Sequence, residues 1–194
     1  DTWLNPAWPV RVYGRERMHE AGPTVIVANH LSLVDILVLF RLQSHFKWVS
    51  KAENFRVPLI GWNMVLCGYI PIQRGTASSA HAMMQKCDEA IRGGSSIMMF
   101  PEGTRSSTGR LRSFKLGAFE IAQRNHVPIQ PIVIRGTGDA LPKKGFVLQG
   151  RHPISIEVLD PIPAEEVGAT DPESMLTQVR EIFVGALANK PDPS

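Results

Sequence analysis

Short apolar runs alternate with amphipathic stretches along the chain. Short apolar runs predict strands at residues 24–29, 46–51, 68–74, 95–100, 129–136 and 152–160. Between and after them, apolar residues recur at the spacing of a helix face, over residues 33–42, 80–91, 114–122 and 176–187. This alternation is typical of an α/β protein. We expect one domain over residues 1–194, with a mixed, mostly parallel sheet flanked by helices.

Turn and cap residues indicate where several elements begin or end. Pro71 restricts the 68–74 run to an edge or irregular strand, because proline cannot donate to a central ladder. Ser113 can cap the helix that follows it, and Asp171, which a proline follows, is a strong helix start. The last residues, 189–194, are expected to fray.

Two titratable residues, His30 and Asp35, interrupt the apolar run 27–39. If Ser32 is the helix N-cap, Asp35 falls at the third helical position, as in a capping box, and a purely structural cap is one interpretation. The same arrangement leaves His30 on the preceding turn, from which its imidazole can fold back onto the carboxylate. A carboxylate kept ionised by the helix dipole would fix the tautomer of His30 and stabilise its protonated form. The second interpretation is therefore a general base with its orienting partner.

A polar loop follows the strand predicted at 95–100. Its residues are Glu102, Gly103, Thr104 and Arg105. The loop is rich in backbone donors, and the planar guanidinium of Arg105 suits a phosphate, although an ordinary turn with a surface arginine is the alternative. Lys115 and Arg74 are further candidate cations for the same anion, while a strand-end arginine such as Arg74 is ordinarily solvated.

Composition narrows the classes of partner. The 194 residues are 43% hydrophobic and 20% charged, which suits one folded domain with a substantial core. The formal charge of +3 suits a phosphate-bearing molecule or an anionic membrane surface, and without a Lys/Arg-rich block no nucleic acid is expected. Cys67 and Cys87 are isolated, which favours a reducing compartment over a disulfide scaffold. No metal-ligand spacing, P-loop or nucleophile elbow occurs, so no metal is expected.

Any contact with a membrane is expected to be peripheral, because no apolar run reaches the roughly 18–20 residues that span a bilayer. Residues 1–20 are a candidate interfacial segment with the aromatic and basic cluster Trp3, Leu4, Trp8 and Arg11. Residues 57–72 are a second candidate, as membrane contact or acyl-chain groove, and plain core packing is the alternative for both. Because the chain begins abruptly, the sequence leaves open whether it is a fragment that has lost a membrane anchor.

Four segments occur in order along the chain: Asn29-His30-x-Ser32-x-x-Asp35, Gly68 to Arg74, Phe100 to Ser106, and Val127 to Pro131. Together they resemble the glycerolipid acyltransferase family, especially the bacterial-type 1-acylglycerol-3-phosphate acyltransferases. The ordered set is far more specific than any one segment. The resemblance implies a glycerol-3-phosphate acyltransferase-like fold.

By this resemblance, the protein moves a fatty acyl group from an acyl thioester to the sn-2 hydroxyl of 1-acylglycerol-3-phosphate, which gives phosphatidate. His30 would be the general base and Asp35 its orienting partner. The acceptor site would be formed by Arg74, Glu102, Gly103 and Arg105, with Thr104 and Lys115 beside them. The acyl donor would be acyl-CoA or acyl carrier protein, with no separate cofactor. The protein would act peripherally at the cytoplasmic side of a membrane.

Other functions are compatible with the same residues. The acceptor could instead be another lysophospholipid, glycerol-3-phosphate or an aminolipid. A thioesterase or lipase would use His30 to activate water, and it would consume acyl-CoA without an acceptor. A non-catalytic module that binds lipid phosphates would retain its function in a His30→Ala variant.

Overall fold

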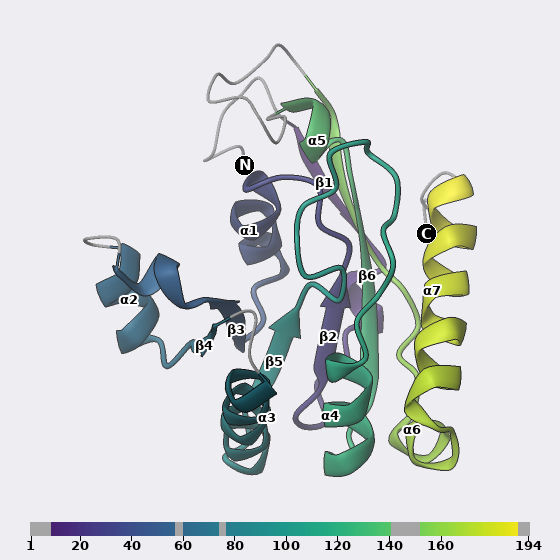
Figure 1. Cartoon of the computed structure of the whole chain (residues 1–194). Helices are drawn as coiled ribbons and strands as arrows, with labels where there is room; N and C mark the ends of the chain where they lie inside the picture. The colour runs from purple at the N-terminus through teal and green to yellow at the C-terminus, as the bar shows by residue number, and fades with distance from the viewer. Residues whose placement is uncertain (1–8, 57–59, 74–76, 141–151, 190–194) are drawn as a thin grey trace.

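The computed structural model describes residues 9–56, 60–73, 77–140 and 152–189. Within them, seven strands form one sheet in the order β1-β7-β6-β2-β5-β3-β4 (Figure 1). The strands are β1 (Val10–Tyr13), β2 (Val25–Ala28), β3 (Phe46–Lys51), β4 (Ile70–Ile72), β5 (Ser96–Met99), β6 (Ile129–Arg135) and β7 (Ile154–Val158).

The sheet is mixed and mostly parallel, as predicted. Strands β4, β3, β5, β2 and β6 are parallel to one another, and β1 is parallel to β7. The pair of β6 and β7 is antiparallel. Because β2, β3, β5 and β6 run in one direction, their carboxyl ends meet at one edge of the sheet, which is where open α/β sheets place their sites.

Helices connect the strands and cover both faces of the sheet. The α-helices are α1 (Val34–Leu39), α2 (Ile60–Leu66), α3 (Ala77–Arg92), α4 (Gly117–Asn125), α5 (Thr137–Ala140), α6 (Ala164–Ala169) and α7 (Pro172–Ala188). Short 3₁₀ helices are η1 (Arg15–Arg17), η2 (Phe40–Leu42) and η3 (Ala52–Arg56).

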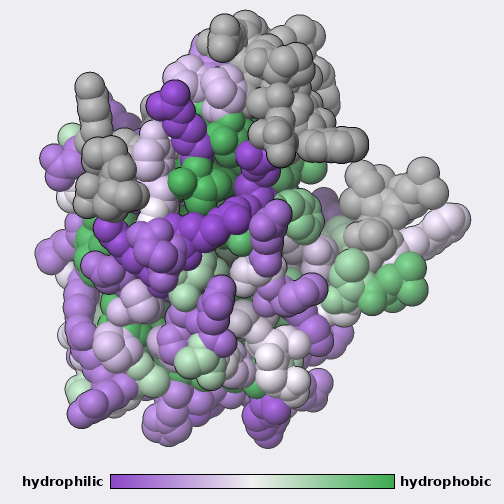
Figure 2. Space-filling view, turned by 180° about the vertical axis from the view of Figure 1, so that it is seen from behind, coloured by the Kyte–Doolittle hydropathy of each residue, from purple (hydrophilic) through white to green (hydrophobic). Residues whose placement is uncertain are grey.

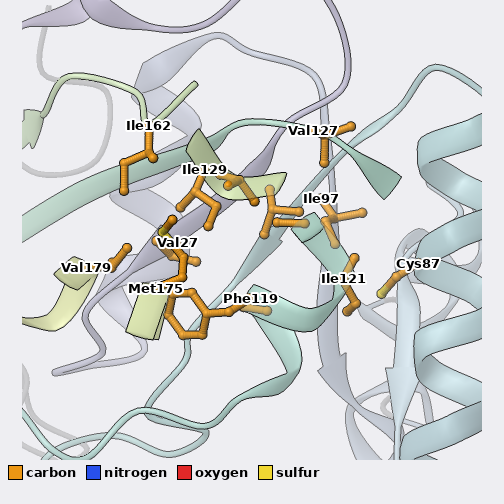
Figure 3. Close-up of a cluster of buried hydrophobic side chains, with 14 of the residues drawn as sticks. Val27, Cys87, Ile97, Phe119, Ile121, Val127, Ile129, Ile162, Met175 and Val179 are labelled. Atoms are coloured by element: carbon orange, nitrogen blue, oxygen red, sulfur yellow. The ribbon is translucent and has the colours of Figure 1, made fainter. Parts of the chain in front are cut away.

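The central strand β2 is buried on both faces, and its successive side chains enter two different cores. Val25 and Val27 belong to the cluster beneath α3, α4, α6 and α7, part of which Figure 3 shows. Ile26 and Ala28 belong to the cluster that contains the inner side chains of α1. The architecture is therefore three-layered, with the sheet between α1 and the larger helical layer.

The larger core contains the only cysteine that is buried among the described residues. Cys87 lies on α3 at the edge of the cluster (Figure 3) and is fully buried, with its Sγ 3.5 Å from the sulfur of Met83. Burial, with a smaller contribution from Asp88, raises the pKa of the Cys87 thiol to about 12, and Arg124 opposes that rise. Cys87 is thus a core side chain in its thiol form and not a nucleophile.

Most predicted elements are confirmed, including the edge position of the strand that contains Pro71. Asp171 caps α7 by accepting the backbone N–H of Ser174 at 2.9 Å. The predicted helix over 33–42 is present as α1 continued by η2. The short strand β1 and helix α2 were not predicted, because the segments that contain them were interpreted as candidate membrane contacts.

Two predicted caps are wrong. Helix α4 begins at Gly117 rather than just after Ser113, because the Lys115 N–H bonds to Pro101 O at 2.8 Å and ties the preceding segment to the loop after β5. Helix α1 begins at Val34, so Ser32 lies outside its N-cap position, although Ser32 Oγ still accepts the Val34 N–H at 3.3 Å.

Several predictions fall outside the described residues. They concern Trp3, Leu4 and Trp8 of the interfacial segment, the first residues of the 57–72 segment, Arg74, and the tail beyond Asn189.

Asn29 fixes the end of β2 to β6. Its side chain is 1% exposed, its Nδ2 donates to Ile134 O at 2.9 Å, and its Oδ1 accepts the Ile134 N–H at 2.7 Å. The amide therefore continues the hydrogen bonding between the two strands one residue beyond β2, immediately before His30.

We expect Asn29→Ala to lower the free energy of unfolding by about 2–4 kcal/mol, because both backbone groups of Ile134 would be left buried and unpaired. Urea denaturation followed by circular dichroism measures this. Asn189→Ala is the control: the exposed Asn189 also donates to a backbone carbonyl, that of Gly185, and its loss should cost about 0.5 kcal/mol or less. Equal stability losses in the two variants would contradict the role given to Asn29.

Candidate active site

The predicted catalytic residues lie at the carboxyl edge of the sheet, where β2 and β5 are neighbours. His30 lies on the turn after β2, and the loop of residues 101–106 follows β5. Figure 1 shows β2 and β5 side by side. The parallel pairing of these strands brings two segments together that are 72 positions apart in sequence.

The structure brings His30 and Asp35 together, as the sequence predicts. His30 Nδ1 lies 2.8 Å from Asp35 Oδ2. The same oxygen accepts the backbone N–H groups of Leu31 at 2.7 Å and Ser32 at 2.8 Å. Asp35 therefore both caps the turn and contacts the imidazole, so its geometry is compatible with the structural and with the functional interpretation.

This geometry assigns different roles to the two nitrogens of His30. An ionised carboxylate only accepts hydrogen bonds, so Nδ1 is the donor to Asp35 and Nε2 carries the lone pair. The Asp35 side chain is fully buried, whereas that of His30 is 14% exposed. The imidazole is thus anchored at its inner nitrogen and remains partly accessible.

Phe100 holds the imidazole from one face. The rings of His30 and Phe100 are stacked, with centroids 4.0 Å apart and an interplanar angle of 9°. Phe100 in turn packs against Trp48 of β3, whose ring centroid lies 5.5 Å away and which is 3% exposed. The orientation of the imidazole is therefore determined by a carboxylate at one edge and an aromatic ring on one face.

Glu102 connects the His30 turn with the segment that follows the polar loop. One carboxylate oxygen accepts the His30 N–H at 2.7 Å, and the other accepts the Arg112 N–H at 2.8 Å. Glu102 is 3% exposed. Burial raises its pKa above the ordinary carboxyl value, and the two backbone N–H donors oppose that rise. With both oxygens bonded to the backbone, Glu102 is placed to position His30 rather than to contact an acceptor directly.

Ser106 completes the attachment of His30. Its backbone N–H donates to His30 O at 2.8 Å, and its hydroxyl donates to Arg110 O at 2.7 Å. The N–H and the carbonyl of His30 are therefore both bonded to the loop that follows β5.

Gly103 and Lys115 also lie together. Gly103 has φ +68°, and a Cβ placed on it would lie 2.9 Å from Cε of Lys115. Glycine is favoured at this position because its backbone is left-handed. The Lys115 side chain is placed over the turn of the polar loop, while remaining exposed.

The other predicted binding residues are less closely tied to His30. Thr104 and Arg105 lie half-buried on the loop between Glu102 and Ser106. Arg74 falls outside the described residues.

Sequence reasoning missed the roles of Phe100, Ser106 and the Arg112 backbone. Phe100 and Ser106 contact His30 from a segment far away in sequence. The Arg112 N–H bonds to Glu102. Phe100 and Ser106 are part of the FPEGTRS segment, which was the one available signal for them. The Arg112 contact involves only its N–H, which any residue except proline provides.

In the part of the chain that the structure describes, no three His, Cys, Asp or Glu side chains are grouped to hold a metal ion. The fold and the site thus define an α/β protein with a histidine–carboxylate pair beside a glycine-containing basic loop. The sequence profile of the Acyltransferase family matches residues 9–135. The chain therefore belongs to the acyltransferase family.

Known proteins resemble the chain over much of its length. It is 40% identical over 140 residues to the chloroplastic 1-acyl-sn-glycerol-3-phosphate acyltransferase of Arabidopsis thaliana, with 72% of this chain and 39% of that protein covered. It is 32% identical over 183 residues to the 1-acyl-sn-glycerol-3-phosphate acyltransferase of Saccharomyces cerevisiae, covering 92% of this chain and 59% of the yeast protein. The chain thus spans about two fifths of the Arabidopsis protein.

A solved structure shares the fold. The crystal structure of the 1-acyl-sn-glycerophosphate acyltransferase PlsC from Thermotoga maritima aligns with a TM-score of 0.80 and 25% sequence identity. The alignment covers 95% of this chain and 74% of that one. The predicted glycerolipid acyltransferase fold is therefore confirmed.

We expect Glu102→Gln to lower the free energy of unfolding by about 1–3 kcal/mol at neutral pH. Glutamine has one side-chain acceptor, so it can keep the N–H bond from either His30 or Arg112, and its own N–H₂ would face the other donor. Urea denaturation measures the loss. Glu181→Gln, an exposed change on α7, should leave stability within about 0.5 kcal/mol of wild type.

The difference between wild type and Glu102→Gln should also depend on pH. Because the folded-state pKa of Glu102 is raised, its protonation contributes stability that is fully present below the ordinary carboxyl pKa. That contribution is lost as the pH rises through the folded value. The stability difference should therefore be larger at about pH 4 than at about pH 7. A difference that grows as the pH rises would show that the N–H bonds outweigh burial.

Proposed function

We propose that this protein transfers a fatty acyl group from an acyl thioester to the sn-2 hydroxyl of 1-acylglycerol-3-phosphate, which yields phosphatidate and a free thiol. The observation that carries the proposal is the His30–Asp35 pair, in which Nδ1 lies 2.8 Å from Asp35 Oδ2. A carboxylate partner on Nδ1 favours the tautomer whose lone pair is on Nε2. The similarity to proteins named 1-acyl-sn-glycerol-3-phosphate acyltransferases supports the choice of substrate.

The reaction needs a base because an alcohol is a poor nucleophile. In the proposed mechanism, Nε2 of His30 accepts the hydroxyl proton as the oxygen attacks the thioester carbonyl carbon. The imidazolium that forms contacts the Asp35 carboxylate at one edge and the face of Phe100, and both interactions favour a cation. The carbon–sulfur bond then breaks, and the departing thiolate takes the proton from His30 or leaves without it. No acyl-enzyme intermediate is required.

The phosphate of the acceptor would bind at the loop after β5. Arg105 offers a planar set of donors on this loop, and Lys115 adds a positive charge over Gly103. Arg74 stays a sequence-based candidate for the same anion. Glu102 would contribute indirectly, because its two backbone hydrogen bonds fix the loop relative to His30.

The acyl donor would be acyl-CoA or acyl carrier protein, with no separate cofactor. Because a lysophospholipid and its product partition into bilayers, the protein would work as a peripheral protein at the cytoplasmic side of a membrane. Among the described residues, no helix combines the length and hydropathy needed to cross a bilayer.

We expect His30→Ala to reduce kcat by about 10²–10⁴-fold with little change in KM for the acceptor, because general-base assistance is lost. Thiol release from acyl-CoA, measured with and without lysophosphatidate, gives both constants. His81→Ala, at an exposed position on α3, should leave both unchanged. Near-wild-type turnover by His30→Ala would exclude the base assignment, and thiol release that does not need an acceptor would indicate a thioesterase.

Asp35→Asn tests the partner separately. The amide oxygen can replace Oδ2 and keep the turn, since Oδ1 has no hydrogen-bond partner in the described structure and its position can take the N–H₂ group. The charge that stabilises the imidazolium is lost, so kcat should fall by about 10²–10⁴-fold while the fold is kept. A variant with normal kcat would leave Asp35 with a capping role alone.

Arg105→Ala should raise KM for lysophosphatidate by about 10²-fold, through loss of a charge-assisted contact with the phosphate. A phosphate-free monoacylglycerol should be affected far less. The control is Arg92→Ala, an exposed change at the end of α3, before β5 and therefore at the opposite edge of the sheet. Equal effects on both acceptors would mean that Arg105 does not bind the phosphate.

A further inference from the structure

Helix α2 exposes large apolar side chains. Trp62 is 66% exposed, Val65 is 64% exposed and Leu66 is 86% exposed. Met64, on the inner side of the helix, is 8% exposed. The helix projects from the molecule, and Figure 2 shows hydrophobic surface on this projection, at the right of the view. Single exposed apolar residues are ordinary, whereas three on one short helix are not.

Helix α1 and η2 carry a second exposed apolar set. Leu33, Leu37 and Phe40 are 51%, 48% and 54% exposed. Their spacing of four and three residues places them on one side of the helix. The opposite side, with Val34 and Val38, is buried against the sheet. We call these three residues, together with Trp62, Val65 and Leu66, the apolar rim.

The two parts of the apolar rim follow β2 and β3, two strands in the same half of the sheet. Helix α1 follows β2, and α2 follows β3 through η3. Strand β5 lies between β2 and β3, and all three are parallel. Both helices therefore begin at the carboxyl edge, the edge that also carries His30 and the polar loop. The apolar rim therefore lies at the same edge of the sheet as the candidate active site.

The charges around the apolar rim are mainly positive. Between residues 33 and 73 the sequence contains four basic residues, Arg41, Lys47, Lys51 and Arg56, and two acidic ones, Glu53 and the fully buried Asp35. Lys51 and Arg56 are exposed, and η3, which contains Arg56, packs against α2. The Lys47 ammonium lies 3.5 Å from the position of a Cβ built on Gly68, just after α2.

This combination matches one kind of partner. Exposed Trp, Leu and Phe side chains surrounded by lysine and arginine are typical of segments that lie in the interface of an anionic bilayer. Tryptophan favours the level of the headgroups, and basic side chains reach the lipid phosphates. A second protein copy would gain nothing from the excess positive charge, because the same surface on both copies would repel.

We propose that the apolar rim docks this protein on the surface of an anionic phospholipid bilayer, with α1 and α2 lying at headgroup level. The carboxyl edge of the sheet would then face the lipids, so that a lysophospholipid could reach His30 without leaving the membrane for water. The second part of this proposal rests on the proposed function. The docking itself does not.

The test uses a variant in which Trp62, Val65 and Leu66 are all changed to glutamine, which keeps helix propensity and removes the apolar side chains. Val184→Gln is the matched control, because Val184 is 47% exposed on α7, on the opposite side of the molecule from α2 (Figure 1). Binding is measured by flotation with vesicles of equal parts phosphatidylcholine and phosphatidylglycerol at low salt. We expect at least a tenfold loss of binding in the triple variant and no change in the control.

Activity assays separate docking from chemistry. The triple variant should keep the wild-type rate with a short-chain lysophosphatidate dissolved as monomers, and lose at least tenfold in rate when a long-chain lysophosphatidate is presented in the same vesicles. A protein that binds vesicles through the rim but acylates no acceptor would uphold the docking and overturn the proposed function.

Other outcomes would overturn the docking itself. Unchanged vesicle binding in the triple variant would do so, and so would a concentration-dependent dimer that the triple substitution abolishes without affecting vesicle binding. If the triple variant fails to fold, as judged by circular dichroism, Leu37→Gln on α1 takes its place, with an expected threefold or larger loss of vesicle binding. Unchanged binding by a folded Leu37→Gln would then overturn the proposal.

Discussion

The backbone of His30 is held between two segments of one loop, and the rest of the site depends on this attachment. Glu102 accepts the His30 N–H, while the Ser106 N–H donates to the His30 carbonyl. A histidine side chain alone can adopt several rotamers, and Asp35 can bond only one nitrogen of the ring. Because the backbone position is fixed first, the contacts with Asp35 and Phe100 select a single orientation of the imidazole. Burying the Glu102 carboxylate costs free energy, because the charged form loses its hydration. Two charge-assisted hydrogen bonds from backbone N–H groups offset part of that desolvation.

The order of the strands is what makes the attachment feasible. In a parallel sheet, the segments that follow neighbouring strands emerge at the same edge, whatever their separation in sequence. Strand β2 lies between β5 and β6, so the His30 turn has the polar loop on one side and β6 on the other. Asn29 extends the bonding to β6 just before the turn, and Glu102 bonds to it from the loop after β5. The turn is thus bonded to β6 on one side and to the loop after β5 on the other, and both strands lie in the middle of the sheet.

The features that could be predicted from the sequence are local ones. The spacing of apolar residues predicts the strands and the long helices, and Asp171 predicts the cap of α7. The His30–Asp35 contact can be predicted because the two residues are five positions apart at a strand-to-helix turn. The contacts that join distant segments could not be predicted in this way. Glu102 was expected to contact the acceptor, yet both of its oxygens bond to backbone N–H groups, which leave no mark in sequence. The wrong cap at Ser113 has the same origin, since a backbone bond from Lys115 to Pro101 delays the start of α4.

Helix α1 connects the chemistry with the surface. Its first turn contains Asp35, its inner side is anchored in the core through Val34 and Val38, and its outer side carries Leu37 of the apolar rim. Six residues therefore link the orienting carboxylate, the sheet and the proposed lipid contact in one short rigid element. Exposed apolar side chains such as Leu37 are costly in water, and a bilayer at that face would remove this cost without any movement of Asp35. On this view, docking would need to change only the surroundings of the site, because the geometry of His30 is already set by the fold.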